Sequence, residues 1–114
     1  MDYVIGEALG FAAARDEYFG SDDDFSAFQS FLMANPLEGQ VIKDTGGLRK
    51  IRWRGRGHGR RGGLRVIYLH LPQYRRLYLL DVYSKSEQED LTTGDRRVLS
   101  AIADSIRAAL YARQ

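Results

Sequence analysis

Basic side chains recur at every second position along one short segment, as Lys50, Arg52 and Arg54. Alternate residues of a β-strand lie on the same face of a sheet, so these three cations are expected to line one surface. Cations held on a rigid strand suit a polyanion, because the guanidinium group makes forked contacts to phosphate. Ile51 and Trp53 then lie on the opposite face, where they are expected to anchor the strand in the core.

Such a surface could cut RNA without a metal ion. Attack by the 2′-hydroxyl of the RNA needs a group that takes its proton, cations that stabilise the charge growing on the phosphate, and a donor for the leaving oxygen. Arginine is too basic to take the proton readily, whereas crowding by other cations makes a lysine a better proton acceptor. Lys50, which is flanked on its face by Arg52, is therefore the first candidate for the general base.

The charges of the chain are strongly segregated, although its formal net charge is only +2. Residues 1–42 carry a net charge of −7, residues 43–76 carry +10 and residues 77–114 carry −1. A basic block of this density is typical of a site for a polyanion. The other arginines of this block that we expect to contact RNA are Arg49, Arg56, Arg60 and Arg61.

Metal and nucleotide-triphosphate chemistry find little support. The chain has no cysteine, and its two histidines, His58 and His70, belong to different elements, so neither a metal ion nor another cofactor is expected. The glycine-rich run at 55–63 does not open a helix and lacks the Gly-Lys-Ser/Thr ending of a phosphate loop. We expect it to form the loop of a long hairpin.

The patterns around this hairpin predict one α+β domain over residues 1–114. Two N-terminal helices are expected at 8–19 and 21–35, and both should pack on an antiparallel β-sheet of three to four strands. A C-terminal helix should follow, with its apolar side chains at helical spacing. We expect all the helices on one side of the sheet and the cations on the other.

Period-two and continuous apolar patterns place the strands of this sheet at 48–54, 64–71 and 77–83, with a short edge strand at 3–5. No stretch is apolar enough for a membrane span, and Asp2 stands where a signal peptide would be basic. With no cysteine present, the sequence indicates a soluble, cytoplasmic protein.

Three segments, in this order, resemble the HigB branch of the RelE/ParE toxin superfamily. They are TGGLRKIRW at 45–53, GRRGGLRVIY at 59–68 and YSKSEQEDL at 83–91. The resemblance covers residues from about 25 to 110 and implies a RelE-like fold. It also implies the toxin of a type II toxin-antitoxin system: a ribosome-dependent endoribonuclease that cleaves mRNA, inhibits translation, and is held inactive by a cognate helix-turn-helix antitoxin of the HigA kind.

The same resemblance implies four catalytic residues. Lys50 and Arg52 match the paired basic residues of the family's first cationic strand. Arg65 matches the arginine before the Val-Ile-Tyr segment, and Lys85 matches the basic residue after the last strand.

The general base is left open by this comparison. RelE enzymes also use a tyrosine in the C-terminal segment, and this chain has Thr92 at the nearest matching place. Lys50 is our first choice for the base and Tyr83, which also belongs to the expected RNA-binding surface, is the second.

Each of these residues also has a structural interpretation. Arg65 could neutralise Asp81 on the neighbouring strand, Tyr83 could be a packing residue, and Trp53 is expected in the core rather than as a platform for a base. Two other functions compete with the nuclease. A ParE-like protein would poison DNA gyrase, which gives no evident role to the basic cluster, and a non-catalytic RNA-binding module would usually expose more aromatic rings on its basic face.

Overall fold

A computed structural model describes residues 3–54 and 63–113. The elements follow in the order β1 (Val4–Glu7), α1 (Leu9–Tyr18), α2 (Asp22–Ala34), β2 (Gln40–Val41), β3 (Arg49–Trp53), β4 (Leu64–Leu71), the 3-10 turn η1 (Pro72–Tyr74), β5 (Arg76–Ser84) and α3 (Thr93–Ala112). The α+β class, the two N-terminal helices and the C-terminal helix are thus confirmed. None of the helices in the described ranges has both the length and the apolar character that crossing a membrane requires.

The five strands form one mixed sheet in the order β1-β5-β4-β3-β2. The expected three strands of the meander are present as β3, β4 and β5, which pair antiparallel. The sheet exceeds the expected three to four strands because the two-residue β2 pairs with the start of β3, and such a short strand leaves no periodic pattern in the sequence. The edge strand β1 pairs parallel with β5, so the sheet is not purely antiparallel.

Both long helices begin at side-chain caps. Ser21 precedes α2 and its hydroxyl accepts a hydrogen bond from the Asp24 backbone N–H at 3.1 Å. Thr92 and Asp95 form a reciprocal capping box at the start of α3, with bonds of 3.0 and 2.9 Å. Caps of this kind typically contribute about 1 kcal/mol each. Thr92, which stands nearest to the position of the family's tyrosine, therefore has a structural task.

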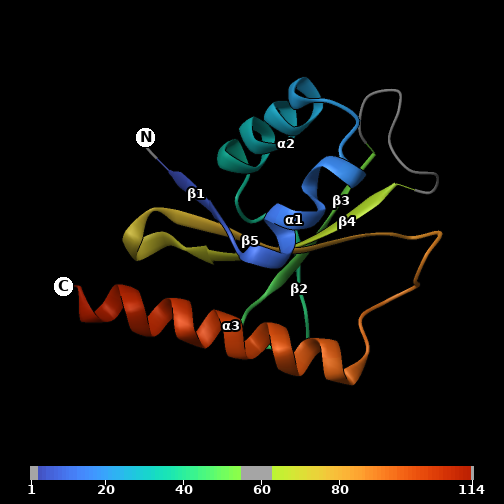
Figure 1. Cartoon of the computed structure of the whole chain (residues 1–114). Coiled ribbons are helices and arrows are strands. Elements are labelled where there is room, and N and C mark those ends of the chain that lie inside the picture. Colours follow the sequence, from blue (N-terminus) through green and yellow to red (C-terminus); the bar gives the residue numbers. More distant parts are fainter. Residues whose placement is uncertain (1–2, 55–62, 114) are drawn as a thin grey trace.

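Helices cover both faces of the sheet (Figure 1). Val66 and Tyr68 of β4 belong to the same core cluster as the buried side chains of α1 and α2, whereas Ile67 and Leu69 belong to a second cluster with those of α3. The expectation that all helices lie on one side is therefore wrong. The physical reason is the apolar run of β4 from Val66 to Leu69, in which every side chain is buried, so that the strand needs cover on both sides.

The segment between α2 and β3 is fixed by Tyr68, whose ring is fully buried. Its hydroxyl donates to the Pro36 carbonyl at 2.8 Å and accepts from the Gly39 N–H at 2.9 Å. A Cβ at Gly39 would lie only 2.7 Å from the Tyr68 ring, so this close approach requires glycine. β2 begins directly after Gly39, with Gln40 opposite Lys50, and among the described residues no strand pairs with the outer edge of β3 beyond Lys50.

Candidate functional site

The four residues proposed as catalytic line one cavity of about 540 Å³ at the uncovered edge of β3. In the sheet, Arg52 lies opposite Arg65, and Arg65 lies opposite Tyr83 on β5. Lys50 is two residues before Arg52 and thus shares its face of the sheet. Lys85, the fourth residue, reaches the cavity from the segment just after β5. The sequence-based choice of these side chains as neighbours is therefore matched by their placement.

Lys50 is held by a carboxylate that the sequence analysis did not single out. Its ammonium group donates to Asp90 Oδ1 at 3.2 Å, and Arg96 lies 3.6 Å from the other Asp90 oxygen. The Leu91 backbone N–H also donates to Asp90, at 2.7 Å. This hydrogen bond, followed by those with Lys50 and the charges of Lys50 and Arg96, holds the pKa of Asp90 below its ordinary value. A protonated lysine has no lone pair, so Lys50 must lose a proton before it can act as a base.

Arg65 is a buried cation, with 8% of its surface exposed. It donates to the Leu64 carbonyl at 3.3 Å, and within the described parts of the chain no carboxylate pairs with it. The expected alternative, a pair with Asp81, is not formed; Asp81 accepts from the Val82 N–H at 2.9 Å instead. Buried charges normally have a partner, so this guanidinium is well placed to hold an anion that enters the cavity.

Tyr83 is buried beside Arg65, with 3% of its surface exposed. Its hydroxyl has no hydrogen-bond partner among the described residues. Burial, and then the negative charge of Asp90, raises the pKa of Tyr83 to about 12, although the charge of Arg65 acts in the opposite direction. A phenol with a raised pKa keeps its proton at neutral pH, so it is suited to donate a proton rather than to accept one.

The remaining predicted RNA-binding residues differ in position. Arg54 is exposed just beyond β3. Arg49 lies on the other face from Lys50, and its guanidinium donates to the Gly39 carbonyl at 2.7 Å. Arg56, Arg60 and Arg61, together with His58, lie outside the described residues. His70 shares a 2.7 Å hydrogen bond with the Tyr3 hydroxyl, and burial lowers its pKa.

In the described ranges, no three histidine, aspartate or glutamate side chains come together as a metal site. The charged side chains that line the cavity are four cations and two carboxylates, those of Glu38 and Glu89, and the Tyr83 phenol lies beside Arg65 without being part of the lining. Asp90, which lies 40 positions from Lys50, and Phe31, which also lines the cavity, were not predicted from the sequence. Phe31 had one signal: it is an aromatic residue outside the buried stripe of α2, which comprises Phe25, Phe28 and Leu32.

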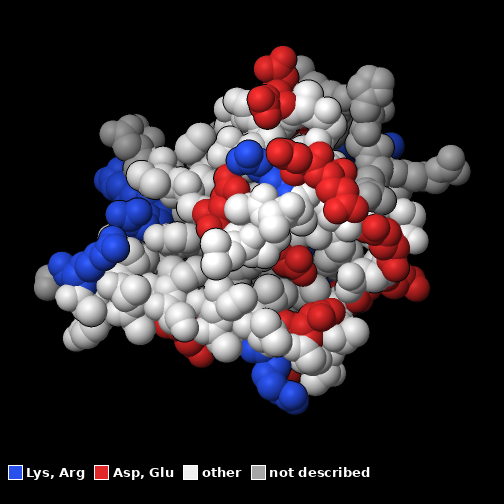
Figure 2. Space-filling model, in the orientation of Figure 1, with Lys and Arg blue, Asp and Glu red and all other residues white. Residues whose placement is uncertain are grey.

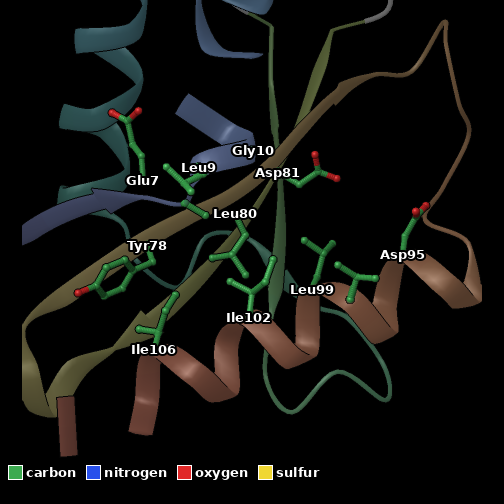
Figure 3. A pocket seen from close by; sticks show the side chains of 12 residues that line it. Glu7, Leu9, Gly10, Tyr78, Leu80, Asp81, Asp95, Leu99, Ile102 and Ile106 are labelled. Atoms are coloured by element: carbon green, nitrogen blue, oxygen red, sulfur yellow. The ribbon is translucent and has the colours of Figure 1, made fainter. Parts of the chain in front are cut away.

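A second cavity, of about 590 Å³, lies between β5, the start of α1 and α3. Figure 3 shows apolar side chains of β5 and α3, among them Leu80, Leu99 and Ile102, facing this space. Its charged lining comprises Glu7, Asp81 and Asp95, and none of the lysines and arginines that the structure describes contributes to it. Burial and the nearby Asp95 raise the pKa of Asp81. Figure 2, in the orientation of Figure 1, shows a band of acidic side chains that runs from the upper middle to the right of the visible surface.

A mixed five-stranded sheet between an N-terminal helix pair and a C-terminal helix, with a cationic row across its strands, defines an α+β fold of the RelE-like toxin type. The chain is similar in structure to the Escherichia coli toxin RelE, solved in the free state as a double arginine-to-alanine mutant, with a TM-score of 0.55 and 14% sequence identity. The match covers 78% of this chain and 90% of that one. No family model matches the sequence. At this identity the likeness establishes the fold, and the activity has to be argued from the site.

Proposed function

We propose that this protein is the toxin of a type II toxin-antitoxin system, a HigB-like endoribonuclease that cleaves mRNA on the ribosome without a metal ion and thereby inhibits translation. The observation that carries the proposal is the cavity at the edge of β3, which gathers Lys50, Arg52, Arg65 and Lys85. Cleavage by the RNA's own 2′-hydroxyl needs a concentration of positive charge at one phosphate. These four side chains supply it.

The buried and exposed cations suit different tasks. Arg65 is buried and can hold the phosphate that is attacked. Because its side chain is already fixed, it loses little conformational entropy when the phosphate binds. Arg52 is exposed and can close on the phosphate from outside. Lys85 neutralises the neighbouring phosphate, and Tyr83, with its proton retained, is a donor for the leaving oxygen.

The proton of the 2′-hydroxyl requires an acceptor. Lys50 takes this role from its neutral form: its ammonium group first releases a proton to solvent, and Nζ then accepts the proton of the 2′-hydroxyl. In the cell, the partners under this proposal are mRNA on the ribosome in the cytoplasm and a HigA-like helix-turn-helix antitoxin that blocks the activity.

The test is an mRNA cleavage assay in a bacterial translation reaction, read by primer extension. We expect cuts in translated mRNA, fewer cuts when translation is blocked, and no loss of cleavage in EDTA-treated protein assayed at a fixed magnesium concentration for the ribosomes. Arg52→Ala should lose most cleavage, whereas Arg97→Ala, an exposed arginine of α3 outside the cavity, should retain it. If cells stop growing because gyrase is inhibited while their mRNA stays intact, the protein is a gyrase poison and not a nuclease. If the protein binds RNA without cutting it, it is a non-catalytic RNA-binding module.

A further inference from the structure

One wall of the cavity at the edge of β3 carries the four cations, and another wall is aromatic. Phe31 of α2 and Trp53 of β3 line the same cavity as the four basic residues. Their ring centroids lie 5.9 Å apart with the planes at 43°. Phe31 is 37% exposed, whereas its neighbours on α2, Phe25 and Phe28, are 8% and 0% exposed. A partly exposed aromatic ring therefore borders the cavity that contains the four cations.

The aromatic wall is held in place before any ligand arrives. The Trp53 indole N–H donates to Asp24 Oδ1 at 3.2 Å, which fixes the ring from one edge. Phe28 packs edge to face against the indole, with centroids 5.3 Å apart and planes at 70°. A ring that is already ordered loses little conformational entropy when a ligand stacks on it.

The short length of β2 explains why both walls reach one cavity. Beyond Lys50 the outer edge of β3 has no strand neighbour among the described residues. Side chains from the two faces of β3 can then line the same space, Arg52 from the face of α3 and Trp53 from the face of α2. A fully paired β3 would separate the cations from the aromatic rings.

We propose that Phe31 and Trp53 form a nucleobase subsite, on which one unpaired base of single-stranded RNA stacks while the adjoining phosphates contact Arg52 and Arg65. Every base has an apolar face that can stack on an aromatic ring, and loss of such a stack by substitution typically weakens binding by roughly tenfold to a hundredfold. The subsite rests on the proposed function, because it supposes that RNA is the polyanion in the cavity. It would hold the strand in one position relative to the cations.

The protein carries its own probe for this contact, because Trp53 is its single tryptophan. The ligands are a short 2′-O-methyl oligoribonucleotide, which cannot be cut by 2′-hydroxyl attack, a fully abasic strand of the same length, and inorganic polyphosphate of equal charge. We expect the intact strand to quench Trp53 fluorescence and to bind at least tenfold more tightly than the abasic strand. Polyphosphate should bind without quenching.

A pair of substitutions at Phe31 separates stacking from folding. Phe31→Leu should weaken binding of the intact strand about tenfold and leave binding of the abasic strand unchanged, whereas Phe31→Tyr should restore the wild-type affinity. Met33→Leu, at an equally exposed position of α2 outside the cavity, is the matched control and should change neither. Thermal unfolding of each variant verifies that the fold is retained.

The outcomes distinguish the subsite from the proposed function. Equal affinity for intact and abasic strands, without a change in Trp53 fluorescence, would overturn the subsite while leaving the cationic cavity as an RNA site. An equal loss of both ligands in Phe31→Leu would show that the ring only supports the cavity, which also overturns the subsite. Binding of none of the three ligands would overturn the proposed function and the subsite together.

Discussion

Two cavities of this protein lie toward opposite edges of one sheet and differ in the charge of their linings. The cavity at the edge of β3 has two lysines and two arginines against two glutamates, whereas the groove beside β5 combines apolar walls with three carboxylates. Their volumes are similar, about 540 and 590 Å³, so size does not distinguish them as binding sites. Their charge distinguishes them, because a phosphate backbone is attracted to the cavity at the edge of β3 and repelled by the groove beside β5. Recognition of RNA is thus expected at one edge of the sheet only.

Lys50 offers the most severe test of the basic cavity as a catalytic site. Lys50→Ala should lower mRNA cleavage by roughly a hundredfold or more if this lysine accepts the proton. Lys50→Arg keeps the positive charge but is too basic for proton transfer, so it should bind RNA normally and still fail to cleave. The measurement is translation-coupled cleavage by both variants with thermal unfolding as the control. Full activity of Lys50→Arg would make the residue an electrostatic contact only and move the base to another group or to water.

The salt dependence of binding compares the two edges directly. Binding of the 2′-O-methyl strand should weaken steeply with added salt, because each phosphate contact releases counterions. Arg52→Ala should reduce the slope of log K against log salt by about one and weaken binding about tenfold at low salt. Fluorescence titrations from low to moderate salt measure both. A flat response in the wild-type protein would contradict binding of any polyanion in this cavity.

Tyr83 lies between the two regions, since charges from both sides act on it: Arg65 from the basic cavity and Asp81 from the groove. Because its folded pKa is about 12 and its ordinary value is 10.0, the unfolded chain releases this proton first, and stability should fall between these pH values. Tyr83→Phe should reduce that alkaline loss by about 2 kcal/mol. Urea unfolding of both proteins between pH 9 and pH 12 tests this.

At neutral pH the same substitution removes a buried hydroxyl without a described partner, so Tyr83→Phe should be as stable as the wild type or more stable by about 1 kcal/mol. Its cleavage rate should nevertheless fall if the phenol donates the proton to the leaving oxygen. Unchanged cleavage by a stable Tyr83→Phe would remove Tyr83 from the chemistry and leave it as a packing residue.

The smallest effect is expected from a substitution in the groove beside β5. Val98 is 60% exposed and lines this groove. Val98→Gln should change stability by less than about 0.5 kcal/mol and should leave RNA affinity and its salt dependence as they are. Titration with the same oligonucleotide provides the measurement. A clear loss of RNA affinity would mean that the RNA path extends across the acidic edge, and the contrast between the two cavities would no longer hold.

Much of the frame of the site follows from local sequence patterns. The period-two segment correctly predicted β3 and the shared face of Lys50 and Arg52, because alternation is a property of consecutive residues in a strand. Leu99, Ile102, Ile106 and Leu110, at helical spacing, likewise predicted the packed face of α3. Caps and turn residues fixed most element ends within a few positions. These features depend on neighbours along the chain, and the sequence displays such neighbours directly.

Tertiary structure alone decided what surrounds those cations. The ion pair of Lys50 with Asp90 joins residues 40 positions apart, and the loop that carries Asp90 has no periodic pattern of its own. Phe31 reaches the basic cavity only because β2 is too short to cover β3 and α2 packs across the opposite face of the sheet. The parallel pairing of β1 with β5 also closes over more than 60 intervening residues. Contacts of this kind depend on how whole elements fill space against each other, and that is settled by packing of the complete core rather than by any local run of residues.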